Sequence, residues 1–321
     1  MQIFQENRLN VVLLSGYLGS GKTTWLRHAL FTKVFGNAQV FTQEAAQQPV
    51  DDLLLGEAMS VTVLTGTAGT PKGKEELISA LLEVAESRTS GRSIGLTIDQ
   101  PDTLIIETSG LADPEEIIAA IKEHPILVYH FVLKETIIMA DALHFHVALK
   151  TDTLCRQQVL SADRIVIAKS EEASEQSLSN LFSAISKINP AAPISLSTFG
   201  VESPVPLLPV PTEIYESILT NACASTTVVS LTIPKEVDWV GFTIWLSALL
   251  HARGDTILRV KGVLHTDEGA LLLQSVRKIM QQPEVLPPEK SVSRPGDIVF
   301  IGEGMNQEAL LASLSSFLGQ S

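Results

Sequence analysis

The stretch that decides the fold is Gly16-Tyr-Leu-Gly-Ser-Gly-Lys22-Thr23, which fits the pattern G-x-x-x-x-G-K-[ST]. It directly follows the apolar run Val11–Leu14 and opens a helical stretch over 22–34. This order of strand, glycine loop and helix aims backbone N–H groups and a helix N-terminus at phosphate. The residues expected to bind the phosphates are Gly16, Gly19, Ser20, Gly21, Lys22, Thr23 and Thr24. Lys22 would neutralise the β- and γ-phosphates, and Thr23 would offer its hydroxyl to Mg²⁺.

A second phosphate-side element is Asp102-Thr-Leu-Ile-Ile-Glu107-Thr-Ser-Gly110. An apolar strand ends in a carboxylate here, and a glycine follows three residues later. In P-loop GTPases an acidic residue at this place holds Mg²⁺ and a glycine N–H senses the γ-phosphate, so Glu107 and Gly110 are the candidates. Many strands end in glutamate, and a solvated strand end is the alternative that this pattern leaves open.

Over the first two thirds of the chain, β-type runs alternate with amphipathic helical stretches. The runs are Asn10–Leu14, Ala38–Thr42, Val61–Leu64, Thr103–Ile106, Thr136–Ala140, Arg164–Ile167 and Ile194–Leu196. Residues 75–86 and 174–188 each place apolar side chains on one helical face, and Asp113-Pro114 starts a helix with Asp113 as its N-cap. The alternation predicts a P-loop α/β domain with a mostly parallel, doubly wound sheet.

Composition shifts at Ser203-Pro-Val-Pro-Leu-Leu-Pro-Val-Pro211, where four prolines exclude a helix interior and a central strand. We therefore expect a nucleotide domain over 1–202, a proline-rich linker over 203–226 and a smaller α+β domain over 227–321. The smaller domain is expected to contain strands at 227–233, 256–264 and 297–301, helices at 238–251 and 306–318, and a mixed segment over 271–280.

Composition excludes several classes of protein. The 321 residues carry a net charge of −13, so the chain is a poor general binder of nucleic acid or anionic membranes. Two cysteines, Cys155 and Cys223, exclude a disulfide-rich scaffold and a four-cysteine zinc site. The N-terminus lacks the order of a signal peptide, and no apolar run approaches the ~20 residues that span a bilayer. A cytoplasmic protein is expected.

With both phosphate-side elements in place, the chain resembles the CobW family of P-loop GTPases, relatives of the nickel-enzyme accessory GTPases. Residues 16–24 are similar to the family's GxLGxGKTT, and 106–114 to its IETTGLADP. Gln43-Glu44 and Asp51 fall where the family has its switch sequence. Residues 257–264 resemble the family's ILRxKG strand, and 298–302 its closing strand. The resemblance implies GTP/GDP and Mg²⁺ as ligands, a client protein as partner, and a role for Glu44 in orienting the attacking water or a metal.

Three departures from the family pattern bear on function. Where the family has a GCxCC metal site, this chain has Gly66-Thr67-Ala68-Gly69-Thr70, and threonine does not replace thiolate for a soft metal. The base-reading NKxD is Ala168-Lys169-Ser170-Glu171. Lys169 and Glu171 keep their roles toward guanine, whereas Ala168 supplies no amide; a loop that binds no base is the alternative. In the switch, Ala46 replaces a glycine, and a solvated Glu44 is the alternative to a catalytic one.

Three further residues are candidates for a functional role: His144, His146 and Cys155. In an extended segment, His144 and His146 would share one face near Asp141, which is a candidate metal site; two histidines that pack and hydrogen-bond are the simpler interpretation. Cys155 begins an expected helix over 155–161, where a thiol pKa can fall. A small core residue is the alternative for Cys155, and the one that we favour.

The sequence favours a slow Mg²⁺-dependent GTPase, with Lys22, Glu44 and Gly110 as catalytic residues, that acts on a client requiring metal delivery, assembly or activation. That client would be a metalloenzyme or a cofactor-dependent enzyme. A nucleotide-gated interaction protein with little hydrolysis is the main alternative, and a small-molecule kinase the third. Nucleotide-dependent homodimerisation also fits this group of proteins. The choice between GTP and ATP stays open because of Ala168 and Glu171.

Overall fold

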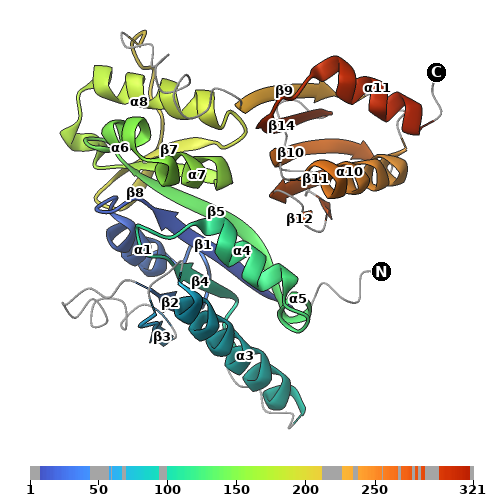
Figure 1. The fold of residues 1–321 in the computed structure, drawn as a ribbon. Coiled ribbons are helices and arrows are strands. Elements are labelled where there is room, and N and C mark those ends of the chain that lie inside the picture. The colour runs from blue at the N-terminus through green and yellow to red at the C-terminus, as the bar shows by residue number, and fades with distance from the viewer. Residues whose placement is uncertain are drawn as a thin grey trace. The chain divides into compact units, whose positions relative to one another are not determined.

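The computed structural model describes residues 8–43, 58, 60–66, 70–93, 100–211, 226–233, 238–254, 256–266, 269–276, 279–280, 283–285 and 296–318. The chain divides into two compact units, residues 1–214 and 215–321 (Figure 1).

An eight-stranded sheet forms the centre of the first unit, in the order β3-β2-β4-β1-β5-β6-β7-β8. Every neighbouring pair is parallel except β7 and β8. The strands are β1 (Leu9–Gly16), β2 (Ala38–Thr42), β3 (Ser60–Val63), β4 (Thr103–Glu107), β5 (Phe131–Asp141), β6 (Arg164–Ala168), β7 (Ile194–Thr198) and β8 (Val201–Pro204). The P-loop α/β architecture with a mostly parallel, doubly wound sheet is therefore confirmed.

Helices cover both faces of this sheet (Figure 1). They are α1 (Lys22–Phe31), α3 (Pro71–Ser93), α4 (Pro114–Glu123), α5 (Leu127–His130), α6 (Phe145–Thr151), α7 (Thr153–Ser161) and α8 (Glu175–Ile188), with a 3₁₀ turn η2 (Ser170–Glu172). The apolar side chains of α1 pack on one face against residues of β1, β2, β4, β5 and β6. On the other face, α4 contacts α3 and α7, and α7 contacts α8. The expected start of α4 is confirmed, because the Asp113 carboxylate accepts a hydrogen bond from the N–H of Glu115 at 2.9 Å.

The chain adds strands first on one side of β1 and then on the other. The chain leaves β1 through α1 toward β2, returns to β4 beside β1, and then extends through β5 to the far edge. In doubly wound sheets, a ligand binds outside the carboxyl ends of the strands at such a reversal. The segments after β1 and β4 lie at this place, because Leu14 pairs with Glu107 at the ends of these strands.

The predicted linker begins inside the sheet, since Ser203 and Pro204 belong to β8. Proline is compatible with this position because β8 is an edge strand. Residues 205–211 have no regular structure, and two side chains of α8 hold them: Ser179 donates to the carbonyl of Pro209 at 2.5 Å, and Gln176 to that of Val210 at 3.2 Å. The remainder of the predicted linker, 212–225, lies outside the described residues.

The second unit is an antiparallel sheet in the order β12-β11-β10-β14-β9, with β13 paired to β11. Its elements are β9 (Thr226–Thr232), α10 (Trp239–Arg253), β10 (Ile257–Thr266), β11 (Gly269–Val276), β12 (Ile279–Met280), β13 (Glu284–Val285), β14 (Asp297–Glu303) and α11 (Gln307–Phe317). Phe242 and Trp245 of α10 pack with Phe300 in its core. This unit is the expected smaller α+β domain, but the segment over 271–280 contains the paired strands β11 and β12 and is not mixed. Within the described residues of both units, no helix is long and apolar enough to cross a membrane.

Candidate functional site

The glycine loop between β1 and α1 depends on two kinds of backbone constraint. Gly16 lies so close to β5 that a Cβ there would be 2.3 Å from the carbonyl oxygen of Met139. Gly19 and Gly21 have φ of +73° and +82°, in the left-handed region that side chains disfavour. The loop therefore requires glycine at three positions of the motif, and it closes tightly before Lys22 begins α1.

The side chain of Lys22 is folded inside this loop. Its exposed fraction is 3%, and its Nζ donates to the carbonyl oxygen of Gly16 at 3.1 Å. Ser20 is fully buried, and its hydroxyl has no hydrogen-bond partner in the described part of the chain. A buried ammonium and a buried hydroxyl in a glycine loop are suited to phosphate oxygens, which accept hydrogen bonds from both.

Thr23 and Glu107 form the candidate metal pair. The Thr23 hydroxyl donates to Glu107 Oε1 at 2.8 Å, and Glu107 is 1% exposed at the end of β4. Two oxygens that neighbour each other around Mg²⁺, each ~2.1 Å from the ion in octahedral geometry, lie about 3 Å apart. The observed separation is thus compatible with joint ligation, and a hydroxyl with a carboxylate is an oxygen donor set that Mg²⁺ accepts.

The segment after β4 lies against the glycine loop. The backbone N–H of Thr108 donates to the carbonyl of Leu14 at 2.9 Å, and its hydroxyl donates to that of Ser15 at 2.8 Å. A Cβ on Gly110 would lie 2.7 Å from the backbone nitrogen of Leu18. Gly110 is therefore in contact with the loop that carries Lys22.

A cavity of about 160 Å³ adjoins the start of α1 and brings the base-reading candidates together. It is lined by Gly21, Thr24, Trp25, Ala168, Lys169, Glu171, Glu172, Ser197, Phe199 and Gly200. Lys169 has a left-handed φ of +58°, and its Nζ donates to Asp141 Oδ2 at 2.5 Å. Burial acts to raise the pKa of Asp141, but the hydrogen bond from Lys169 and two backbone N–H donors outweigh it and hold that pKa below its usual range. The carboxylate of Asp141 therefore fixes the ammonium of Lys169, and leaves the stem of Lys169 to line the cavity.

The turn between β7 and β8 is a wall of this cavity that sequence reasoning missed. Phe199 has a φ of +48° and is 77% exposed, which is unusual for a large aromatic residue. A Cβ on the next residue, Gly200, would lie 2.7 Å from the Cβ of His28 in α1. The available signal was the Phe199-Gly200 pair, which follows the predicted strand at 194–196 after two intervening residues, because glycine after a strand is typical of a turn.

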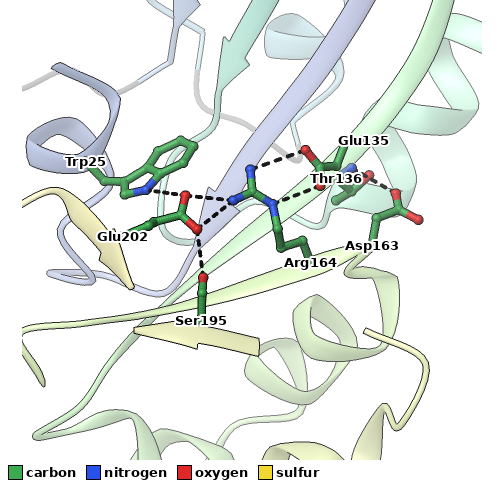
Figure 2. A network of polar contacts seen from close by, with 7 residues as sticks. All are labelled: Trp25, Glu135, Thr136, Asp163, Arg164, Ser195 and Glu202. Carbon is green, nitrogen blue, oxygen red and sulfur yellow. Dashed lines mark hydrogen bonds and ion pairs between the residues drawn. The ribbon is translucent and has the colours of Figure 1, made fainter. Parts of the chain in front are cut away.

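A polar network fixes β8 to α1 (Figure 2). Glu202 accepts from the indole N–H of Trp25 at 3.0 Å, from Arg164 at 2.7 Å and from the hydroxyl of Ser195 at 2.8 Å. Arg164 also donates to Glu135 at 2.9 Å, and its guanidinium lies 5.6 Å from the ring centroid of Trp25. Burial acts to raise the pKa of Glu202, but the guanidinium of Arg164 and its other donors lower it overall. The network joins β5, β6, β7 and β8 to the helix that follows the glycine loop.

Both units match models of known protein families. Residues 10–195 match the family described as "CobW/HypB/UreG, nucleotide-binding domain". The chain belongs to the CobW/HypB/UreG family. Residues 226–318 match the "Cobalamin synthesis protein cobW C-terminal domain", so both units have counterparts among CobW proteins.

Similar proteins extend over nearly the whole chain. The zinc chaperone YjiA of Escherichia coli K12 is 30% identical over 332 aligned positions, which cover 96% of this chain and 98% of YjiA. The crystal structure of the Zn(II)-bound YjiA GTPase superposes with a TM-score of 0.61 at 24% identity, and covers 97% of this chain and 99% of that one. A zinc-bound triple mutant of YjiA gives a TM-score of 0.62 at the same identity. These superpositions show that the CobW fold is shared.

The place of the CobW cysteine motif is only partly described. Thr67, Ala68 and Gly69 lie outside the described residues, as do Glu44 and Asp51 of the predicted switch. On either side of the loop, the Glu76 carboxylate of α3 accepts from Thr65 N, Thr65 Oγ1 and Gly66 N, and Thr70 Oγ1 accepts from the N–H of Gly73 at 3.2 Å. The first of these hydrogen bonds, from the backbone of Thr65, is the main cause of the lowered pKa of Glu76. Hydrogen bonds to α3 therefore hold both ends of the loop.

Two other candidates are corrected by the structure. The extended segment at His144 and His146 was a wrong prediction, because α6 begins at Phe145 and turns the two side chains apart. Within the described residues, no three His, Cys, Asp or Glu side chains form a group that could hold a metal ion. Burial raises the pKa of the Cys155 thiol to about 12, so the interpretation as a reactive thiol was wrong and that as a core residue is confirmed.

Proposed function

We propose that this protein is a Mg²⁺-dependent GTP-binding protein and slow GTPase that couples its nucleotide state to a client protein. The observation that carries the proposal is the convergence of Lys22, the Thr23–Glu107 pair and Gly110 on one glycine loop. Membership of a nucleotide-binding family supports it. The description of the relative YjiA as a GTPase supports the choice of reaction.

Each residue has a defined task in this proposal. Lys22 exchanges its hydrogen bond to the Gly16 carbonyl for phosphate oxygens, which places a positive charge where negative charge gathers in phosphoryl transfer. Thr23 and Glu107 would hold Mg²⁺, which when bound neutralises charge on the phosphates. The backbone N–H of Gly110 would contact the γ-phosphate. Glu44 is kept as the residue that orients water, on the strength of the sequence alone.

The base cavity would be selective for guanine, but less so than in GTPases with the full motif. Glu171 lines the cavity and supplies a carboxylate that can accept from a guanine edge. Ala168 offers no side-chain amide, and the loss of one polar contact reduces discrimination by roughly 1–3 kcal/mol. GTP would therefore be preferred over ATP by a modest factor.

The client would be a metalloenzyme or a cofactor-dependent enzyme, as the zinc-chaperone description of the relative YjiA suggests. Delivery through a thiolate site at 66–70 is not part of the proposal. The chain has Thr67, Gly69 and Thr70 in place of the three cysteines, and zinc requires thiolate, imidazole or carboxylate ligands.

The test is equilibrium binding and hydrolysis of GTP and ATP, each with and without Mg²⁺. The variant Lys22→Ala removes the ammonium, and Lys187→Ala, on the exposed surface of α8, is the matched control. We expect Mg²⁺-dependent GTP binding that only Lys22→Ala abolishes. If well-folded wild-type protein bound neither nucleotide, the proposed function would be wrong.

A second candidate is a nucleotide-gated interaction protein with little hydrolysis. The replacement of the switch glycine by Ala46 favours this candidate, because alanine restricts the backbone of a segment that must change conformation. Tight GTP binding with no turnover above the Lys22→Ala background would select it over the GTPase.

A further inference from the structure

Helix α7 contacts both loops that would surround the γ-phosphate. At its N-terminus, the N-cap residue Asp152 lies near Tyr17 of the glycine loop, and its carboxylate raises the pKa of the Tyr17 hydroxyl. Further along, the side-chain amide of Gln158 donates to the carbonyls of Gly110 and Ala112, at 3.3 and 3.0 Å. One short helix thus holds the phosphate loop and the sensor loop at the same time.

Gln158 is fully buried, and only one end of its amide is satisfied. Its Nε2 makes the two hydrogen bonds to the sensor loop, whereas its Oε1 is buried with no hydrogen-bond partner among the described residues. A buried acceptor without a partner costs free energy, and an apolar side chain of similar size would avoid that cost. The donor end of Gln158 is therefore what favours glutamine over an apolar residue here.

The two carbonyls that Gln158 holds lie on either side of Leu111. They fix the backbone of the sensor loop in the conformation in which Gly110 touches the backbone of Leu18. Without these donors, the packing of Ala112, which is fully buried, would still anchor the end of the loop, but the carbonyl of Gly110 would be free to rotate.

We propose that Gln158 is a positioning residue that keeps the Gly110 N–H directed at the γ-phosphate, and so sets the preference for triphosphate over diphosphate. This inference rests on the proposed function, because it requires a nucleotide in the glycine loop.

The chain offers a matched control in Asn189, the residue that ends α8 and binds the C-terminal end of α7. Asn189 is also fully buried, and its Nδ2 donates to the carbonyls of Val159 and Ala162 at 2.8 and 3.0 Å. Gln158→Met and Asn189→Leu each replace a buried amide by an apolar side chain of similar size. Both remove hydrogen bonds to backbone carbonyls, but only the first touches the sensor loop.

The experiment measures dissociation constants for GDP and for a non-hydrolysable GTP analogue in wild type and both variants, with Tm for each protein. We expect Gln158→Met to weaken binding of the analogue about two- to twelvefold and to leave GDP unchanged, as for the net loss of one ordinary hydrogen bond. Asn189→Leu should lower Tm and leave the ratio of the two constants unchanged. Gln158→Asn, whose amide is one methylene shorter, should shift the ratio in the same direction, and it replaces the Met variant if that protein does not fold.

Two results would overturn the inference, and they are distinguishable from failure of the proposed function. If Gln158→Met weakened both nucleotides by the same factor, or shifted their ratio no more than Asn189→Leu, Gln158 would be a structural residue only. If wild type bound neither nucleotide, the proposed function itself would have failed, and Gln158 would have no role toward phosphate.

Discussion

Replacing Gly110 by alanine is the sharpest perturbation of the proposed γ-phosphate contact. The new Cβ would lie 2.7 Å from the backbone nitrogen and 2.8 Å from the Cα of Leu18. Ordinary contact begins at 3.4 Å, so the two loops must separate by about 0.7 Å. Because the obstacle is backbone and not the end of a flexible side chain, no change of rotamer relieves it.

The size of the effect follows from that displacement. A hydrogen bond of ~2.9 Å from the Gly110 N–H to a phosphate oxygen would lengthen to about 3.6 Å, which is beyond hydrogen-bond range. A hydrogen bond to a charged group contributes roughly 1.5–3 kcal/mol. Gly110→Ala should therefore weaken binding of a GTP analogue by about ten- to a hundredfold, whereas GDP, which lacks the γ-phosphate, should bind as before.

The assay is titration calorimetry with GDP and with a non-hydrolysable GTP analogue, in the presence of Mg²⁺. Gly262→Ala is the control, because its Cβ would lie 2.6 Å from the carbonyl oxygen of Asp297 in the second unit and produces an equal clash away from the nucleotide. It should lower Tm without changing either affinity. Equal loss of GDP and analogue affinity in Gly110→Ala, or no loss at all, would refute the role of Gly110 as a phosphate sensor.

Three further predictions follow from the charges and burial described above. The pKa of Glu202 is lowered in the folded state, so its contribution to stability is present above the unfolded pKa of ~4.5 and is lost as pH falls through the folded pKa. Glu202→Gln should therefore make Tm less dependent on pH in that acidic range. An unchanged profile of Tm against pH would contradict the role of Arg164 in lowering this pKa. With a thiol pKa of about 12, Cys155 should resist alkylation at pH 8 until the protein unfolds. Mass spectrometry of a Cys223→Ser variant would measure the extent of labelling at Cys155. Rapid labelling of the native protein would contradict the burial of this thiol. Glu76→Gln should speed amide hydrogen exchange at the start of the loop after β3, because an amide offers one acceptor oxygen where the carboxylate offers two. Unchanged exchange would show that the carboxylate does not hold the loop.

Much of the fold was predictable because its signals are local. The buried strands of the first unit are continuous apolar runs, and the glycine loop and the Asp113-Pro114 helix start each lie within a few residues. Lys22, Thr23, Glu107 and Gly110 were predictable as a candidate site, because they lie at or shortly after the carboxyl ends of two strands that meet at one edge of the sheet.

What could not be predicted has either an ambiguous local signal or depends on packing between residues far apart in the sequence. Phe199 enters the base cavity only because β8 folds back on β7, and the prolines in this region indicated a linker and not an edge strand. Gln158 is an unremarkable glutamine in the sequence, and its relation to Gly110 appears only when α7 packs beside the loop 48 residues earlier. The helix at His146 was missed because seven residues are too few for a clear period.

The position of Trp25 gives the protein a native optical reporter. Its indole lines the base cavity, hydrogen-bonds Glu202 and lies beside the guanidinium of Arg164, so its emission is sensitive to charge and polarity at that wall. The two other tryptophans, Trp239 and Trp245, belong to the second unit. A protein in which both are phenylalanine would emit from Trp25 alone, and nucleotide entry could be followed in real time with unlabelled GTP and ATP.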